Sequence, residues 1–136
     1  MSVSYPLKSL EVTASELTAL KNAGVKTAAA LLDAAKTPKD RKVLSKKTGI
    51  DQKRLLELAN RADRMRVKGL GKEYAALLCA VGVDTVRELK YRNPAKLAEA
   101  LATANKKRKL VRLVPTGKAV GRWIEEAKKL QPKISY

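Results

Sequence analysis

The feature that most limits the fold of this chain is a set of helix-start and helix-stop signals that occurs twice. Ala23-Gly24-Val25 aligns with Val81-Gly82-Val83, about 58 residues later, and Thr27 then aligns with Thr85. A second set aligns at a spacing of 65, namely Leu55, Leu58 and Ala62 with Val120, Trp123 and Ala127. The slip indicates a longer connection in the second copy, from Asn105 to Val114. Internal repetition on this scale predicts two similar units that pack as a pair.

The residue types favour helices over strands. Ala and Leu dominate the apolar residues, Phe is absent, and aromatic residues make up only 4 % of the chain. Ser, Thr, Asp or Asn precedes most of the apolar-periodic segments, as expected at helix starts. The predicted helices run from about 13 to 22, 27 to 35, 37 to 48, 51 to 65, 72 to 80, 84 to 90, 93 to 104 and 115 to 130. We therefore expect an all-α fold of two units, each with four to five short helices, packed as one compact body.

The repeat also predicts the domain boundaries. Residues 1–66 form the first unit, residues 67–130 the second, and residues 131–136 a loose tail after Gln131-Pro132. No apolar stretch approaches the roughly 20 residues that span a bilayer. The N-terminus lacks the pattern of a signal peptide. We expect a cytoplasmic protein with no role for a membrane.

The charge of the chain is far from ordinary. Thirty Lys and Arg residues oppose thirteen Asp and Glu, and no His is present, so the net charge is +17. Such an excess repels itself and weakens the compact state unless a polyanion offsets it. Nucleic acid is the commonest polyanion, and an acidic protein or an anionic membrane surface would serve as well.

Catalytic chemistry finds little support in the sequence. With no His and a single Cys, the chain offers neither a zinc cluster nor a His-based triad. The single thiol, Cys79, lies in an apolar run and is expected to be buried and inert. We expect no enzyme, no metal, no cofactor and no small-molecule substrate.

A turn with two glycines carries the most specific binding signal. In Gly69-Leu70-Gly71 glycine allows positive φ and close approach of a partner, and a helix begins directly afterwards. The amides of such a turn and of the first helical turn suit a phosphate. Arg66, Lys68 and Lys72 flank the turn, and Leu70 would anchor it in the core. The alternative is a helix corner where the glycines only permit tight packing.

This pattern resembles the helix-hairpin-helix motif, in which hairpin amides contact backbone phosphates without reading sequence. The match covers Ala62 to Ala80. The first copy departs from it, since its equivalent turn reads Glu11-Val12-Thr13-Ala14-Ser15. There the Thr13 and Ser15 hydroxyls can cap the helix themselves, so we expect this copy to be mainly structural.

The chain as a whole resembles a known family. The segments that carry the resemblance are Ala59–Gly71, Ala76–Leu78, Val81–Leu89, Arg92–Pro94, Leu97, Asn105, Leu110–Val111, Pro115 and Trp123–Leu130. They are similar to the uncharacterised bacterial "domain of unknown function 4332" family over about Leu10 to Leu130. The resemblance implies tandem helix-hairpin-helix (SAM-like) units but no activity.

A basic run lies in the longer connection of the second copy. It contains Lys106, Lys107, Arg108, Lys109 and Arg112, and it either follows a phosphate backbone or forms a solvated loop. A second basic cluster surrounds the third predicted helix, and it suits either contact with nucleic acid or solubility alone. It contains Lys36, Lys39, Arg41, Lys42, Lys46 and Lys47. Trp123 falls on an apolar stripe, which favours a core position over base stacking.

These features lead to one expectation and two alternatives. We expect sequence-independent binding of nucleic acid, with duplex DNA favoured and RNA as the alternative, through the second hairpin and the basic run. The expected contact residues are Arg66, Lys68, Gly69, Leu70, Gly71, Lys72, Lys106, Lys107, Arg108, Lys109 and Arg112. Binding to DNA would make the protein nucleoid-associated. The other interpretations are a helical adaptor that docks an acidic protein and a protein associated with RNA or the ribosome.

Overall fold

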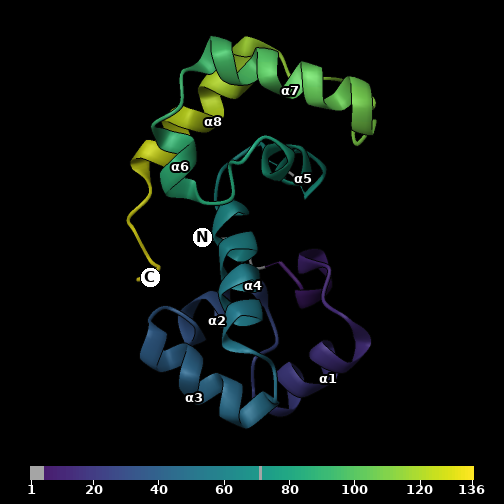
Figure 1. Ribbon diagram of the computed structural model, residues 1–136. Helices are drawn as coiled ribbons and strands as arrows, with labels where there is room; N and C mark the ends of the chain where they lie inside the picture. Colours follow the sequence, from purple (N-terminus) through teal and green to yellow (C-terminus); the bar gives the residue numbers. More distant parts are fainter. Residues whose placement is uncertain (1–4, 71) are drawn as a thin grey trace. The chain divides into compact units, whose positions relative to one another are not determined.

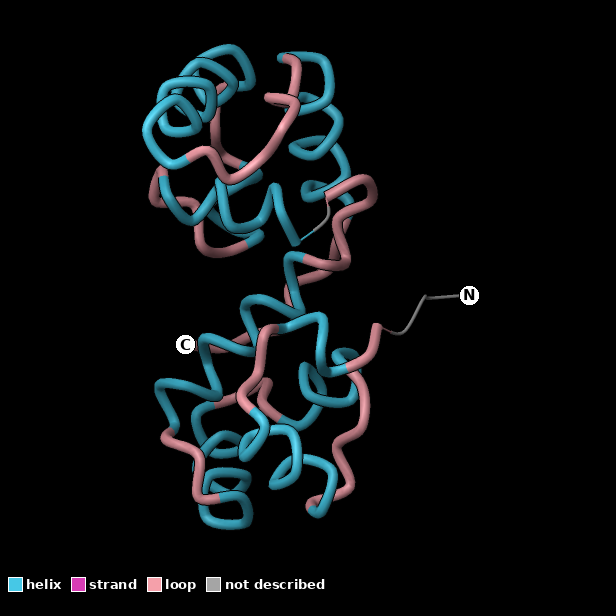
Figure 2. Tube along the Cα trace, turned by 90° about the vertical axis from the view of Figure 1, so that its right-hand side faces the viewer, coloured by secondary structure: helices cyan, strands magenta, loops and turns pink. Residues whose placement is uncertain are grey.

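The described chain is entirely helical, as the sequence predicts. The computed structural model describes residues 5–70 and 72–136. Within them lie eight α-helices and one short 3-10 helix, and the only extended pairing is an isolated bridge between Pro6 and Thr27 (Figure 1, Figure 2). None of the described helices is long and apolar enough to cross a membrane.

The chain forms two compact units. The first comprises the residues up to Asp63 together with Lys133–Tyr136, and the second is Arg64–Pro132. The boundary therefore falls three residues before the one expected from the repeat. The first unit contains η1 (Leu7–Leu10), α1 (Ala14–Asn22), α2 (Ala28–Ala34), α3 (Pro38–Thr48) and nearly all of α4 (Gln52–Arg64). The second contains α5 (Lys72–Ala80), α6 (Val86–Lys90), α7 (Pro94–Arg108) and α8 (Gly117–Lys129).

The internal repeat is visible in where the helices begin and end. Helix α1 begins at Ala14 and α5 at Lys72, which is 58 residues later, and α2 and α6 begin at the same spacing. Helices α4 and α8 both contain 13 residues and are 65 positions apart. Helices α3 and α7 begin 56 residues apart and end 60 apart, so the elements correspond in order and the spacing changes at the third helix and the connection after it.

The turns that follow α1 and α5 share one geometry. Gly24 and Gly82 adopt φ of 85° and 84°. In the first turn Val25 N–H donates to the Leu20 carbonyl at 2.9 Å, and in the second Val83 N–H donates to Leu78 at 2.9 Å. A left-handed glycine just after a helix satisfies its last carbonyls in this way. The two copies thus share backbone conformation as well as sequence.

Side-chain caps begin the helices where the sequence placed them. The hydroxyls of Thr13, Thr27, Thr37, Thr85 and Thr116, and the Asn93 amide oxygen, each accept from a backbone N–H three residues later. Each such cap stabilises its helix by roughly 1 kcal/mol. Because these bonds are local, the sequence itself fixes where the short helices begin.

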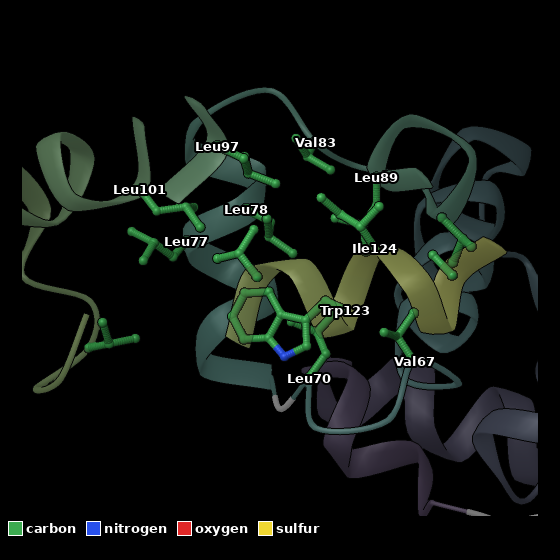
Figure 3. Close-up of a cluster of buried hydrophobic side chains, with 14 residues drawn as sticks. Val67, Leu70, Leu77, Leu78, Val83, Leu89, Leu97, Leu101, Trp123 and Ile124 are labelled. Atoms are coloured by element: carbon green, nitrogen blue, oxygen red, sulfur yellow. The ribbon is translucent and has the colours of Figure 1, made fainter. Parts of the chain in front are cut away.

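The second unit has its own core. Leu77 and Leu78 of α5 pack with Leu89 of α6, Leu97 of α7 and Trp123 of α8 (Figure 3). Helix α8 packs against α6 and α7, and α5 packs against α7. Trp123 is only 4 % exposed, which confirms its expected core position. Cys79, expected to be buried, is instead exposed, because its neighbours Leu77 and Leu78 occupy the inward face of α5.

The C-terminal residues, expected to be loose, are bonded to the first unit. Ser135 N–H donates to the Lys36 carbonyl at 2.8 Å, and the Tyr136 hydroxyl bonds to the Asn60 side chain at 2.8 Å. Arg41 is 4 % exposed and donates to the carbonyls of Ala35 and Ser135 at 2.9 and 2.7 Å. Arg41 therefore joins the end of α2 to the returning chain.

Candidate nucleic-acid interface

Positive charge is unequally divided between the two units. The second carries 17 Lys and Arg against 6 Asp and Glu, whereas the first carries 13 against 7. The net charges are thus +11 and +6 in units of similar length. A polyanion is attracted more strongly to the second unit, in which both predicted contact elements lie.

The described part of the glycine turn, Lys68 to Leu70, contains the left-handed glycine that its sequence predicts. Gly69 adopts φ of 82°, and both Gly69 and Lys68 are exposed. Leu70 is 6 % exposed and belongs to the same buried cluster as Trp123 (Figure 3), so its role as the anchor of the turn is confirmed. Gly71 lies outside the described residues, as does the side chain of Lys72.

Two arginines near this turn are used inside the fold. The Nη2 of Arg66 donates to the Gln131 carbonyl at 2.9 Å, which holds the chain as it leaves α8. Arg64 is 6 % exposed and its Nη1 donates to the Asp84 carbonyl. Of the cations that the sequence places around the turn, Lys68 is the one that the structure shows exposed to solvent.

The corresponding turn of the first unit is closed by its own side chains. Glu11, which aligns with Gly69 at the 58-residue spacing, is also left-handed, with φ of 58°. Thr13 and Glu16 form a capping box, in which Thr13 N–H donates to Glu16 at 2.9 Å and Glu16 N–H donates to the Thr13 hydroxyl at 3.1 Å. The helix start of the first unit thus has internal partners.

A cation from α4 completes this arrangement. Arg54 donates to both carboxylate oxygens of Glu16, at 2.8 and 3.1 Å, and the Glu16 side chain is 13 % exposed. The Arg54 guanidinium, helped by Thr13, lowers the pKa of Glu16 from 4.5 to about 2. At the equivalent positions the second unit has Tyr74 and Ala119, so this ion pair exists in the first unit alone.

The basic run lies partly on a helix, where the sequence predicted a loop. Helix α7 continues to Arg108, so Lys106, Lys107 and Arg108 form its last turn. Lys109 then adopts a left-handed conformation with φ of 50° and ends the helix. All five cations of the run are exposed. Within the described chain, none of the five forms an ion pair.

The basic cluster around α3 is divided between two roles. Arg41 is buried and bonded, and burial lowers its pKa. Five lysines of the cluster, Lys36, Lys39, Lys42, Lys46 and Lys47, are exposed. Lys36 pairs with Asp33 at 3.6 Å. Arg41 therefore belongs to the interior of the first unit and does not contribute to a surface charge patch.

An open groove lies beside the glycine turn of the second unit. Its volume is about 640 Å³, and Lys68, Gly69, Tyr74, Leu113, Arg122 and Trp123 are among the residues that line it. The Tyr74 hydroxyl donates to the Leu113 carbonyl at 3.2 Å, which joins α5 to the chain that follows the basic run. The groove thus lies between the glycine turn and the segment that follows the basic run, and Glu125 and Glu126 also line it. No local pattern marked Arg122, an exposed cation of α8 that directly precedes the buried Trp123 in sequence.

The described residues contain no group of three or more Cys, Asp or Glu side chains placed to hold a metal ion. The comparison with protein families is positive. The model of a domain of unknown function, DUF4332, matches residues 10–130, which is nearly the whole chain. The chain belongs to the DUF4332 family. No curated protein and no solved structure matches it. For this DUF4332 chain, function therefore has to be argued from the geometry and charge of its own residues.

Proposed function

We propose that this DUF4332 protein binds the phosphate backbone of nucleic acid, with duplex DNA as the preferred form, independently of sequence and without catalysis. The two units are interpreted as tandem helix-hairpin-helix repeats, of which the second makes the contact. The observation that carries the proposal is the accumulation of exposed cations in the second unit, together with a left-handed glycine turn; those of the basic run have no carboxylate partner among the described residues.

The comparison between the two turns supports this assignment. In the first unit the Thr13 hydroxyl and the Glu16 carboxylate bond to backbone amides at the start of α1. Gly71 aligns with Thr13 and has no side chain that could accept a hydrogen bond. Tyr74 aligns with Glu16. A phosphate oxygen supplies the acceptor that the second unit lacks at these positions, and the helix dipole favours it there.

Side-chain cations would extend the contact beyond the hairpin. Lys68 lies in the turn, and the run from Lys106 to Arg112 offers five further cations. Each phosphate that they neutralise releases counterions, so log affinity falls with log salt by about 0.9 for each contact on duplex DNA. Backbone contacts of this kind position a protein on DNA without reading its bases.

A charge placed at the hairpin tests the proposal directly. Gly71→Asp should lower the affinity for a mixed-sequence duplex by roughly tenfold or more, because a carboxylate repels the phosphate held there. The control is Ala14→Asp, which puts the same charge on the exposed first residue of α1 in the first unit. Equal affinities for the two variants, or binding by the natural protein that does not depend on salt, would contradict the proposal.

The groove favours a second candidate function, docking of an acidic protein. Leu113, which is 76 % exposed, lines the groove with the cations Lys68, Arg122 and Lys129. Glu125 and Glu126 line it as well, but the cations outnumber them, which suits an acidic peptide with an apolar anchor. A pull-down that survives nuclease treatment would support this adaptor role over nucleic-acid binding. Competition among duplex DNA, duplex RNA and single strands would separate DNA binding from association with RNA or the ribosome.

A further inference from the structure

The two units differ in the connection that follows their third helix. In the first unit α3 ends at Thr48 and α4 begins at Gln52, so only Gly49–Asp51 lie between them. In the second unit Lys109–Thr116 lie between α7 and α8. The connection is thus five residues longer in the second unit, and α7 is four residues longer than α3. The second unit therefore contains an insertion. The first unit forms the corresponding helices without it, so the fold does not require it.

The insertion and the helical turn before it concentrate positive charge. Five of the seven residues from Lys106 to Arg112 are Lys or Arg, and none is acidic. We call this segment the basic loop. Its cations are exposed and, in the described chain, have no carboxylate partner. Like charges at this density repel one another, which is unfavourable in the isolated protein and is offset when a polyanion binds.

The backbone of the basic loop holds a conformation that its sequence disfavours. Lys109 ends α7 with φ of 50° and ψ of 44°. The corresponding residue at the end of α3 is Gly49, with φ of 77°. Glycine occupies this left-handed region without steric cost, whereas a residue with a Cβ does not. The second unit thus keeps a lysine where glycine would fold more easily.

One side chain closes the basic loop. The Asn105 Nδ2 donates to the Val111 carbonyl at 3.0 Å, and Val111 N–H donates back to the Asn105 Oδ1 at 3.0 Å. Val111 is 8 % exposed and belongs to the core cluster of the unit. Two residues later, the Leu113 carbonyl accepts from the Tyr74 hydroxyl. The segment between Asn105 and Val111 is therefore fixed at both ends.

We propose that the basic loop is a preformed binding element for a phosphate backbone and that Asn105 is its positioning residue. The inference rests on the proposed function and adds the device that makes the loop effective. A loop ordered before binding loses less conformational entropy when it meets the strand, so more of the electrostatic attraction is retained as affinity. Asn105 itself makes no contact with the ligand.

Two asparagines on the same helix give a matched test. Asn105→Ala removes the loop closure, and Asn93→Ala removes the side-chain cap at the other end of α7, where Lys96 N–H donates to the Asn93 Oδ1 at 3.1 Å. Neither change alters the net charge. On a labelled duplex, with both variants well below their melting temperatures, Asn105→Ala should bind roughly tenfold more weakly and Asn93→Ala within about twofold of the natural chain.

The salt dependence separates positioning from general destabilisation. Asn105→Ala keeps every cation, yet the slope of log affinity against log salt should fall by about 0.9 for each phosphate that the loop no longer neutralises. A purely structural role would leave that slope unchanged in the folded variant. Equal affinities and equal slopes for the two asparagine variants would overturn the inference, while salt-dependent binding by the natural chain would leave the proposed function standing.

A second variant covers a failure of Asn105→Ala to fold. Leu110 is 40 % exposed within the basic loop. Leu110→Gly increases the freedom of the loop and keeps its charges, so it should weaken binding in the same direction. A folded Leu110→Gly protein with unchanged affinity and an unchanged salt slope would contradict the role assigned to loop order.

Discussion

At the scale of single residues, the structure separates cations used inside the fold from cations left at the surface. Arg41, Arg61 and Arg66 each donate to a backbone carbonyl far away in sequence. The guanidinium presents several donors in a rigid fork, which suits this bridging role. The exposed lysines of the basic loop stand instead at the surface. Net charge alone therefore overstates the number of cations available to a ligand.

The ion pair of the first unit should make its stability depend on acid. Arg54 holds the pKa of Glu16 at about 2, below the 4.5 of an unpaired carboxyl. The stabilisation is complete above pH 4.5 and is lost as the pH falls toward 2, because the unfolded chain then binds a proton more readily. We expect the pair to contribute about 2 kcal/mol. Thermal melting of the natural protein and Glu16→Gln between about pH 6 and about pH 2 measures this loss.

The glutamine variant should melt lower at neutral pH and show a flatter pH profile. Asp33→Asn is the control, since the Asp33 side chain is 60 % exposed and its pairing with Lys36 at 3.6 Å is largely screened. If the natural protein and Glu16→Gln lost stability in parallel on acidification, Glu16 would not be the responsible carboxyl.

The left-handed lysine predicts a stability gain that opposes binding. Lys109→Gly should stabilise the second unit by about 1 kcal/mol, because glycine adopts this conformation without strain. Affinity for a duplex should fall at the same time, since one cation is removed.

The reverse change, Gly49→Ala, should destabilise the first unit by about 1 kcal/mol through the backbone alone, as an added Cβ meets no atom within 4 Å. Denaturant melts of both variants measure these effects, and a destabilised Lys109→Gly would refute the assignment.

At the scale of helices, the sequence predicts those helix boundaries that are set by bonds between neighbouring residues. The caps at Thr13, Thr27 and Thr85 each act on a neighbouring amide, so the helix starts follow from the residues themselves. The end of α7 depends on Asn105 reaching Val111, and the path of the tail depends on Arg41. These bonds join positions that no local pattern relates. The hairpin and basic loop could be proposed from sequence, whereas the use of Arg66 inside the fold could not.

The returning tail should be a structural part of the first unit. Deletion of Lys133–Tyr136 removes the Ser135 carbonyl from buried Arg41 and the Tyr136 hydroxyl from Asn60. We expect a destabilisation of about 1–3 kcal/mol, the usual cost of leaving a buried donor without its partner. Hydrogen exchange should show it as faster exchange in α2 and α3. Lys133→Ala, which alters only an exposed side chain, is the control, and unchanged exchange after the deletion would show that the tail is dispensable.

At the scale of the whole molecule, the two units are similar in backbone but different in charge. Both units keep the same helix order and the same left-handed glycine turns after α1 and α5. The first fills its hairpin with Thr13, Glu16 and Arg54, which stabilise it internally. The second has other residues at these positions, gains the basic loop and has the larger net charge. The first unit thus uses these side chains internally, whereas the second has the greater excess of cations, which the proposed function assigns to contact with a polyanion.

This division predicts that the position of charge matters more than its amount. Two triple variants each remove three positive charges: Lys106, Lys107 and Arg108 to Gln, and Lys42, Lys46 and Lys47 to Gln. All six residues are exposed and lie on α7 or α3. In the proposal the three α7 cations contact phosphates. The α7 variant should therefore bind a duplex more than about tenfold more weakly and flatten the salt slope by about 0.9 for each phosphate left without its cation. The α3 variant should keep the slope of the natural protein and lose only the weak long-range attraction, which salt screens beyond about 10 Å. Equal effects in the two variants would mean that net charge alone drives binding, and the second unit would then have no privileged surface.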